Sequence, residues 1–305
     1  SSKIIFNISL LVLLIASIIT LNETFSIDRV TLFNNSVVID HMSSLMKIIT
    51  LIGAFLVLVI SSAYLKSFKI FKIEYPVLIL SSVLGMMVMI SSNDLIVFYM
   101  GLELQSLALY VLATFNRDQL KSSEAGLKYF VLSALSSGLL LYGCSLIYGF
   151  SGSTNFNVIS SQLNSNEYVL TFGIVFILVG LAFKISAVPF HMWAPDVYEG
   201  SPNSITAFFL ITPKIAILGL FVRLFLYSFY DFLFPWQTII LLSSIASMTL
   251  ASFAAMAQKK IKRLLVYSAI GHVGYMLLGF SCGSLEGIQA LFLYLVIFYH
   301  LRNHK

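Results

Sequence analysis

Four ionisable residues lie deep inside long apolar stretches of the sequence, where a charged side chain is unfavourable. A charge at the centre of a bilayer costs about 2.5–3.5 kcal/mol on insertion scales. In a poorly hydrated cavity, however, a lysine loses much of its preference for the charged form and can exchange a proton readily. These four residues, Glu103, Lys128, Lys184 and Lys214, are therefore candidates for a proton or ion pathway.

Two of the lysines stand close to prolines. Pro189 follows Lys184 by five residues, and Pro213 directly precedes Lys214. Because proline has no amide hydrogen, Pro189 is predicted to interrupt its helix and to leave the carbonyl of Ile185 without a partner. Hydrocarbon offers no water in exchange, so a charge beside a broken helix must face protein or a water-filled cavity. Pro213 is expected to loosen the backbone beside the second lysine in the same way.

Glu103 lies about twelve residues, roughly 18 Å, from the end of its helix at Phe115, too deep for its side chain to reach water. It needs a cationic partner or a proton. Lys128, in the next apolar stretch, is the expected partner, and an ion pair that only fixes helix packing is the alternative. Small residues at 133–138 should allow close helix approach there.

Two histidines could join such a pathway. His191 follows the predicted break and His272 lies in a later apolar stretch. Each is either a hydrogen-bonded core residue or a relay member that titrates near neutrality. A haem-binding electron carrier with these two histidines as axial ligands is a further hypothesis, but haem needs facing histidines at matched depth. His191 is expected at a loop edge, which disfavours haem.

Other charged residues lie near the ends of apolar stretches and are expected to reach the interface. These are Lys47, Asp94 and Arg223. The acidic pair Asp196 and Glu199 is predicted to lie in a solvated turn or helix cap.

The composition is that of an all-α polytopic membrane protein. Of 305 residues, 59% are hydrophobic and only 10% are charged, whereas soluble domains carry about 25% charged residues. Because a span needs about 20 apolar residues, we predict one transmembrane domain, 1–305, with nine to ten helices and an irregular loop at 151–168. The predicted spans are 4–21, 44–65, 76–93, 95–115, 126–150, 169–190, 204–230, 236–257 and 264–283, with a partial one at 286–300.

The basic residues between these spans fall almost entirely on one side if the spans alternate in direction. The other side receives Arg29 alone. This bias follows the positive-inside rule, supports the predicted order of spans and accounts for the net charge of +5 without a nucleic-acid partner. The basic side would be the cytoplasm of a bacterium or the matrix of a mitochondrion. Cys144 and Cys282 form no CxxC pair, so neither a metal site nor a disulfide framework is predicted.

Five strings of the sequence together resemble NADH dehydrogenase subunit 2, the smallest antiporter-like membrane subunit of respiratory complex I. They are MGLELQSLALYVL (100–112), EAGLKYFVLSALSSGLLLYG (124–143), FKISAVPFHMWAPDVYEGSP (183–202), TAFFLITPKIAILG (206–219) and KRLLVYSAIGHVGYMLLG (262–279). The resemblance implies an antiporter-like helix bundle with a broken helix at Lys184–Pro189. It also implies a proton-translocating subunit whose relay consists of Glu103, Lys128, Lys184, Lys214, His191 and His272.

The same resemblance implies that this chain carries no redox centre and binds no cofactor or metal. The enzyme as a whole would use NADH, FMN, iron–sulfur clusters and ubiquinone in other subunits. The implied partners are neighbouring antiporter-like subunits and small hydrophobic subunits of the complex I membrane arm, together with membrane lipid. A subunit of a cation/proton antiporter complex, which shares these motifs, is the alternative function.

The sequence departs from the family at both ends. By this resemblance we expect the first family helix to be absent from the given sequence, and the second broken helix with its lysine to be missing beyond Tyr299. We therefore expect either a partial sequence or a split subunit completed by a second polypeptide. The string GFSCGSLEGIQ (279–289) and the richness in Ile, Phe, Ser and Asn favour a mitochondrial inner membrane, with a bacterial plasma membrane as the alternative.

Overall fold

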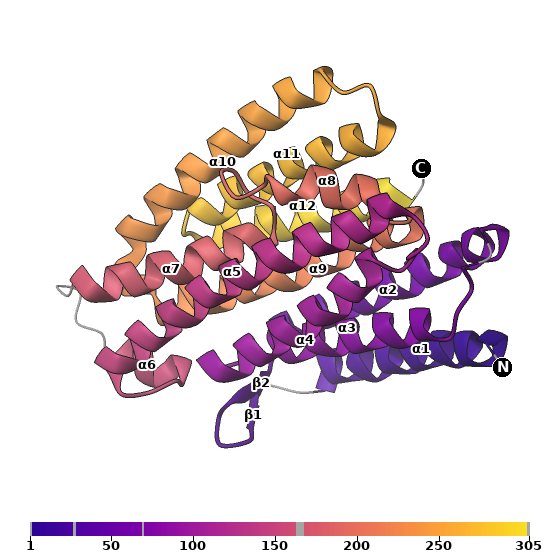
Figure 1. The fold of residues 1–305 in the computed structure, drawn as a ribbon. Helices are drawn as coiled ribbons and strands as arrows, with labels where there is room; N and C mark the ends of the chain where they lie inside the picture. The colour runs from indigo at the N-terminus through magenta and orange to yellow at the C-terminus, as the bar shows by residue number, and fades with distance from the viewer. Residues whose placement is uncertain (1, 27–28, 69, 163–167, 304–305) are drawn as a thin grey trace. The chain divides into compact units, whose positions relative to one another are not determined.

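The computed structural model describes residues 2–26, 29–68, 70–162 and 168–303. The described residues are mostly helical, as the apolar composition predicts, and every predicted span overlaps a helix, although the predicted span 169–190 extends past the end of its helix at Lys184 (Figure 1). Seven of the described helices are long and apolar enough to cross a membrane. Three further apolar helices are shorter, at Glu74–Ile90, Leu170–Lys184 and Leu285–Ile297. The predicted all-helical membrane fold is therefore confirmed.

The chain divides into two compact units, and unit 1 comprises Ser1–Tyr129 and Gly200–Leu220. In it α1 packs on α2, α2 on α3, and α3 on α4. Its helices are α1 (Ser2–Ser26), α2 (His41–Ser67), α3 (Glu74–Ile90), α4 (Leu95–Ala113), the first turns of α5 (Leu120–Ser151) and most of α9 (Asn203–Arg223).

Helices α3 and α4 approach each other through glycines. A Cβ on Gly85 would lie 2.6 Å from the backbone nitrogen of Gln105 and 2.7 Å from the carbonyl oxygen of Gly101, so no larger residue fits. Small residues of this kind let two transmembrane backbones approach closely. Close packing then stabilises the helix pair, since in lipid the hydrophobic effect does not drive helices together. The close contact places Glu103, two residues after Gly101, in a tightly packed part of α4.

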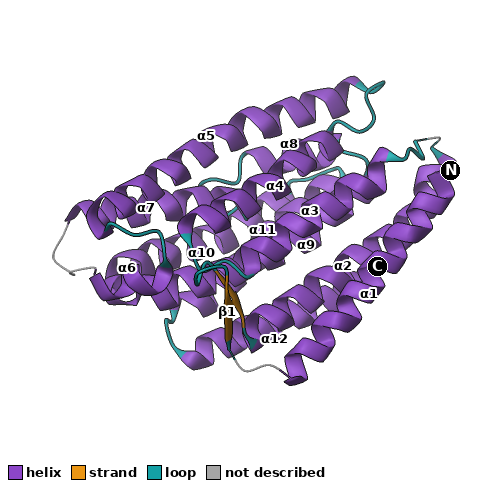
Figure 2. Ribbon diagram, turned by 90° about the horizontal axis from the view of Figure 1, so that it is seen from below, coloured by secondary structure: helices purple, strands orange, loops and turns teal. Residues whose placement is uncertain are grey.

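A short hairpin that the sequence did not predict joins α1 to α2 (Figure 2). Its antiparallel strands are β1 (Val30–Leu32) and β2 (Val37–Ile39). Asn93, just before α4, holds the hairpin, because its side-chain amide donates to the carbonyl of Asn35 at 2.8 Å and its backbone amide donates to the carbonyl of Ser36 at 2.8 Å. Asp94 then caps α4, accepting from the amide of Ile96 at 2.8 Å. Aspartate is a favoured N-cap residue, because its carboxylate accepts hydrogen bonds from free amides of the first turn. Asp94 therefore lies at the end of a span, as predicted.

Unit 2 comprises Phe130–Glu199 and Phe221–Lys305. In it α10 packs along α11, and α11 packs on α12. Its elements are the rest of α5, α6 (Phe156–Gln162), α7 (Tyr168–Lys184), α8 (Trp193–Gly200), a π-helix (Leu224–Ser228), a 3-10 turn (Tyr230–Phe232), α10 (Leu233–Met256), α11 (Ile261–Ser281) and α12 (Leu285–Asn303).

Helix α6 corrects the expectation that 151–168 is irregular throughout. Asn155 precedes this helix, and its side-chain oxygen accepts from the amide of Asn157 at 3.1 Å. Asparagine hydrogen-bonds backbone groups in this manner at helix starts, so the polar composition of the loop did not exclude a short helix.

Candidate functional site

The predicted break in the helix that carries Lys184 exists, but Pro189 does not begin it. Helix α7 ends at Lys184 itself. Ser186 has a φ of +60°, its amide donates to the carbonyl of Phe183 at 3.0 Å, and the amide of Ala187 donates to the carbonyl of Ala182 at 2.9 Å. These two bonds form the Schellman arrangement that terminates a helix, with serine in the place where glycine is usual. A left-handed residue therefore ends α7 before the proline is reached.

The carbonyl of Ile185 was expected to lose its partner, and this expectation is wrong. The Ser186 hydroxyl donates to that carbonyl oxygen at 2.5 Å. In an apolar interior an unsatisfied carbonyl is costly, and a hydroxyl from the adjacent residue supplies the missing donor. The same serine thus provides both the left-handed turn and the compensating hydrogen bond.

Two serines of α10 hold the next part of the break. Ser247 Oγ accepts from the amide of Val188 at 2.9 Å, and Ser243 Oγ donates to the carbonyl of Val188 at 2.6 Å. The serines are one helical turn apart, so they share a face of α10 and reach both polar groups of one residue. Their pairing was missed in the sequence, although serines spaced four apart in an apolar helix are a weak signal of such a contact.

Trp193 connects the end of α7 to the start of α8. Its indole Nε1 donates to the carbonyl of Phe183 at 2.9 Å, and its ring stacks on that of Phe183 with centroids 5.5 Å apart. The eight residues between Lys184 and Trp193 are consequently fixed at both ends. The broken helix is a well-bonded structure with a defined backbone path.

Lys184 is buried, with 6% of its surface exposed. Its ammonium donates to the Ser133 hydroxyl of α5 at 2.6 Å. The ammonium also belongs to the last residue of α7, where the negative end of the helix dipole favours a cation. Gly180 lies one turn before Lys184 on α7, and its carbonyl accepts a hydrogen bond from the Ser136 hydroxyl of α5 at 3.1 Å. The small residues of α5 therefore bring it close to α7, as the sequence predicted for this stretch.

The two candidate histidines belong to the same unit as Lys184. His191 is buried within the break. His272 of α11 is half-buried, and its Nδ1 lies 2.7 Å from the hydroxyl of Tyr294 on α12. Each position suits a hydrogen-bonded core residue as well as a relay member, so both predicted roles stay predictions.

Unit 1 holds the other candidates, of which Lys214 is buried on α9 and Glu103 is half-buried on α4. Helix α9 runs through Pro213 without a break, and the expectation that this proline loosens the backbone beside Lys214 stays a prediction. The Thr212 hydroxyl donates to the carbonyl of Phe208 at 3.0 Å, the bond to the carbonyl four residues back that hydroxyls commonly make inside helices.

Lys128 is less buried than the sequence suggested. Its ammonium lies 2.7 Å from the carboxylate of Glu124, one turn back on α5, and 41% of its side chain is exposed. Exposed pairs at this spacing contribute about 0.3–0.5 kcal/mol. Glu124 is thus a partner that sequence reasoning overlooked, and the expected pairing of Lys128 with Glu103 stays a prediction.

Arg223 was expected to reach the interface, and this is wrong. Its side chain is buried at the end of α9, directly before the π-helix. Single π-helical turns inside helices often occur at functional positions. A buried arginine at such a turn adds a candidate to the ionisable groups of the chain. The position of Arg223 near the end of an apolar stretch did not indicate that its side chain would be buried.

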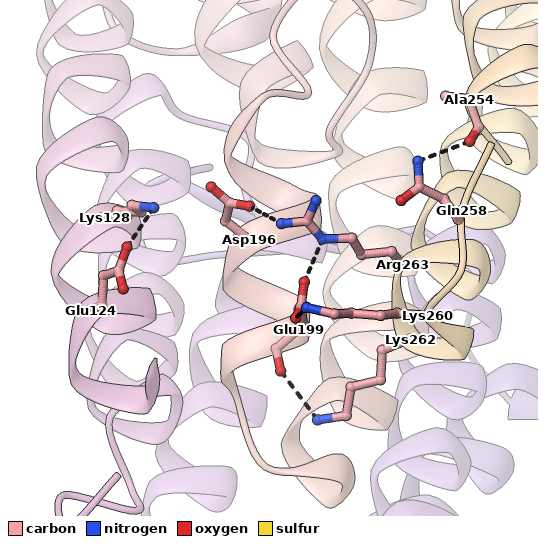
Figure 3. A network of polar contacts seen from close by, with 9 residues as sticks. All are labelled: Glu124, Lys128, Asp196, Glu199, Ala254, Gln258, Lys260, Lys262 and Arg263. Atoms are coloured by element: carbon pink, nitrogen blue, oxygen red, sulfur yellow. Dashed lines mark hydrogen bonds and ion pairs between the residues drawn. The ribbon is translucent and has the colours of Figure 1, made fainter. Parts of the chain in front are cut away.

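Asp196 and Glu199 lie in the short helix α8, Asp196 in its first turn, and form a partly exposed ion cluster with three cations at the start of α11 (Figure 3). Lys260 Nζ donates to Glu199 Oε1 at 2.5 Å, and Arg263 donates to both carboxylates, at 2.7 Å in the case of Asp196. Lys262 Nζ reaches the carbonyl of Glu199 at 3.4 Å. The hydrogen bond from Lys260, followed by that from Arg263, holds the pKa of Glu199 below its ordinary value.

The six predicted relay residues divide between the two units. Glu103, Lys128 and Lys214 lie in unit 1, and Lys184, His191 and His272 lie in unit 2. A continuous line from Glu103 through Lys184 to Lys214 would cross both units and stays a prediction. Among the described residues, no group of three or more His, Cys, Asp and Glu side chains could hold a metal ion.

A family model described as NADH:quinone oxidoreductase/Mrp antiporter, TM matches residues 92–303. The chain belongs to this family. The match includes every candidate of the relay and the whole of the broken helix. The membership confirms the antiporter-like type of membrane fold that the sequence motifs implied.

Curated bacterial proteins are similar over nearly the whole chain. The NADH-quinone oxidoreductase subunit N of Pelagibacter ubique (strain HTCC1062) is 64% identical over 98% of this chain and 63% of its own length. The subunit N of Rhodospirillum rubrum is 55% identical over 85% of this chain and 54% of its own length. The chain therefore spans somewhat more than half the length of these relatives. The relatives are bacterial, and the expected mitochondrial location gains no support from them.

Solved structures share the fold. A chain of respiratory complex I from Thermus thermophilus, solved with bound aureothin, superposes with a TM-score of 0.81 at 29% identity, covering 96% of this chain and 63% of that one. A chain of the Mrp complex from Dietzia sp. DQ12-45-1b superposes with a TM-score of 0.87 at 22% identity, covering 99% and 58%. The second likeness shows the fold alone.

Proposed function

We propose that this chain is the antiporter-like, proton-translocating subunit of a membrane-bound NADH:quinone oxidoreductase. It corresponds to subunit N of the bacterial enzymes and to NADH dehydrogenase subunit 2 of mitochondrial complex I. The similarity to bacterial subunit N over 98% of the chain supports this assignment. It also favours a bacterial plasma membrane, the alternative location, over a mitochondrial inner membrane, with the basic loops on the cytoplasmic or matrix side.

The observation that carries the proposal is the setting of Lys184. A buried ammonium on the last residue of a broken helix, hydrogen-bonded to the Ser133 hydroxyl at 2.6 Å, is placed where a proton can pass between two polar groups inside the helix bundle. No redox chemistry is required of this chain. Its work is electrostatic, because a shift of charge at one relay member alters the proton affinity of the next.

The relay comprises Glu103, Lys128, Lys184 and Lys214, with His191 and His272 as auxiliary members. The cofactors of the enzyme, NADH, FMN, iron–sulfur clusters and ubiquinone, would be held by partner subunits. Those partners include neighbouring antiporter-like subunits and small hydrophobic subunits of the membrane arm. A second polypeptide that supplies further helices, or a longer form of this chain, would complete the path across the membrane.

The test uses the assembled enzyme in membrane vesicles and the variant Lys184→Met. Proton pumping driven by NADH oxidation should fall strongly, because methionine has a similar length but cannot carry a proton. The amount of assembled enzyme should be unchanged. Lys259→Met is the matched control, since Lys259 is an exposed lysine of the loop before α11. Normal pumping in the Lys184 variant would contradict the proposal.

A cation/proton antiporter subunit is the second candidate, because the description of the matching family model names Mrp antiporters beside NADH:quinone oxidoreductases. Such a complex would exchange cations for protons without NADH or quinone. Purification of the intact complex distinguishes the two, because flavin and iron–sulfur absorbance support the oxidoreductase. Cation-dependent proton exchange in a complex without those absorbances would support the antiporter.

The haem hypothesis is tested by the visible spectrum of the purified chain. Two histidine ligands would produce a strong haem band. His272 already has one ring nitrogen hydrogen-bonded to Tyr294. We expect no such band.

A further inference from the structure

The hydroxyl that contacts Lys184 belongs to a group of serines on one side of α5. Ser133 is fully buried and receives the ammonium hydrogen bond at 2.6 Å. Ser137 lies one helical turn further along α5, on the same face. Ser136 stands beside it and bonds the carbonyl of Gly180 on α7. The serine-bearing side of α5 is therefore the side that meets α7.

Ser137 is one of several buried serines whose hydroxyls have no hydrogen-bond partner in the described part of the chain, with Ser82, Ser91, Ser204, Ser228 and Ser244, and it is the one that lies a helical turn from the Lys184 contact. Hydroxyls in apolar helices usually donate to a carbonyl three or four residues earlier, as Ser61 does to Leu58 at 2.8 Å and Ser106 does to Leu102 at 2.7 Å. Ser137 has only 4% of its surface exposed, yet within the described part of the chain its hydroxyl has no hydrogen-bond partner. A buried polar group in that condition calls for water or another mobile partner.

We propose that Ser133 and Ser137 form a hydroxyl track that takes the proton of Lys184 along α5. The inference rests on the proposed proton-translocating function and names the first steps of the path. The Lys184 ammonium passes a proton to Ser133 Oγ while the hydroxyl proton of Ser133 passes to a water molecule held at Ser137. That water releases one of its own protons to the next water along the path, so it is neutral again and the positive charge leaves with the released proton. Lys184 becomes neutral, Ser133 keeps one proton, and nothing is oxidised or reduced.

The chemistry suits serine because a hydroxyl is both a donor and an acceptor. It can receive and release a proton in one concerted exchange without ever holding a stable charge. The path runs from the end of α7 in the direction of increasing α5 residue number, away from the end of α5 that carries Lys121 and Lys128. A dry apolar helix face would offer no such exchange, since a bare proton cannot cross hydrocarbon.

The experiment compares four variants in the assembled enzyme: Ser133→Ala, Ser137→Ala, Ser136→Ala and Lys184→Met. NADH-driven proton pumping in vesicles is measured per amount of assembled enzyme. Ser133→Ala and Ser137→Ala should each lower the pumping rate about tenfold, the effect of about 1.4 kcal/mol on a barrier. Ser136→Ala is the matched control and should pump almost normally, because its hydroxyl is already committed to the Gly180 carbonyl.

The variant Ser133→Thr adds a rescue, because it keeps the hydroxyl and should restore most of the pumping lost in Ser133→Ala. Normal pumping in Ser137→Ala overturns the track, whatever Ser133→Ala does, since Ser137 is its second member. If Ser133→Ala fails to assemble, Ser137→Ala decides alone, with a tenfold loss supporting the track. Lys184→Met distinguishes failure of the serine track from failure of the proposed function. Normal pumping in that variant would contradict the proton-translocating function itself.

Discussion

The backbone amide of Val188 donates to the hydroxyl of Ser247, 59 residues away in sequence, at 2.9 Å. The Ser247 hydroxyl in turn donates to the carbonyl of Ser243 at 2.7 Å, and the Ser243 hydroxyl donates to the carbonyl of Val188 at 2.6 Å. This closed set of three hydrogen bonds attaches the break after α7 to α10. Any motion of the break must therefore move α10 or rupture these bonds.

Ser247→Ala should destabilise the chain because it leaves the buried amide of Val188 without an acceptor. An unsatisfied buried donor costs about 1–3 kcal/mol. The thermal unfolding midpoint of the purified chain in detergent measures the effect. Ser252→Ala is the control, since Ser252 lies on the same helix, is exposed, and its hydroxyl donates to the carbonyl of Thr249 within that helix. Equal midpoints for the two variants would show that the α10 bonds do not stabilise the break.

The Glu199 cluster should make stability depend on pH in the acidic range. Its cations lower the pKa of Glu199 in the folded chain, so the carboxylate stabilises folding at pH values above the ordinary value of 4.5. That contribution is lost as the pH falls from 4.5 through the lowered folded pKa. Glu199→Gln should therefore flatten the fall of the unfolding midpoint with decreasing pH over this window.

Glu286→Gln is the matched control for Glu199. Glu286 is an exposed carboxylate in the first turn of α12, with no hydrogen bond or ion pair in the part of the chain that the structure describes. The control should reproduce the wild-type pH profile. A Glu199 variant whose profile is as steep as that of the wild type would mean that other groups cause the acid sensitivity.

The spacing of α5 and α7 should depend on Gly143. A Cβ at this position would lie 2.7 Å from the carbonyl oxygen of Gly173 and 2.9 Å from the amide nitrogen of Ile177, both backbone atoms. Gly143→Ala must push the helices apart, and overpacking of this kind costs about 1–3 kcal/mol. The unfolding midpoint should fall, and the Lys184 contact with Ser133 on the same helix pair should weaken.

Gly149 offers the same substitution on the same helix without the clash. A Cβ there meets no atom within 4 Å. Because alanine favours a helix over glycine by about 1 kcal/mol, Gly149→Ala should leave the midpoint unchanged or raise it. If both alanine variants behave alike, close approach of α5 and α7 does not limit stability.

The sequence alone determined the membrane class, the positions of the spans and the candidate ionisable residues. These follow from local chemistry, because a bilayer demands about 20 apolar residues per span and makes every charge inside one conspicuous. The motifs around Glu103, Lys184 and His272 also sufficed to place the chain in its family. Predictions of this kind need no knowledge of which helices meet.

The tertiary structure decided how the break is made and what surrounds Lys184. Pro189 suggested a break at the wrong residue. The left-handed turn at Ser186 depends on hydrogen bonds and packing that cannot be predicted from the type of any single residue. The contacts of Lys184 with Ser133, of Val188 with Ser247 and of Glu199 with Arg263 join residues more than fifty positions apart. Such pairs exist only once helices have packed, so their chemistry cannot be read from the order of residues along the chain.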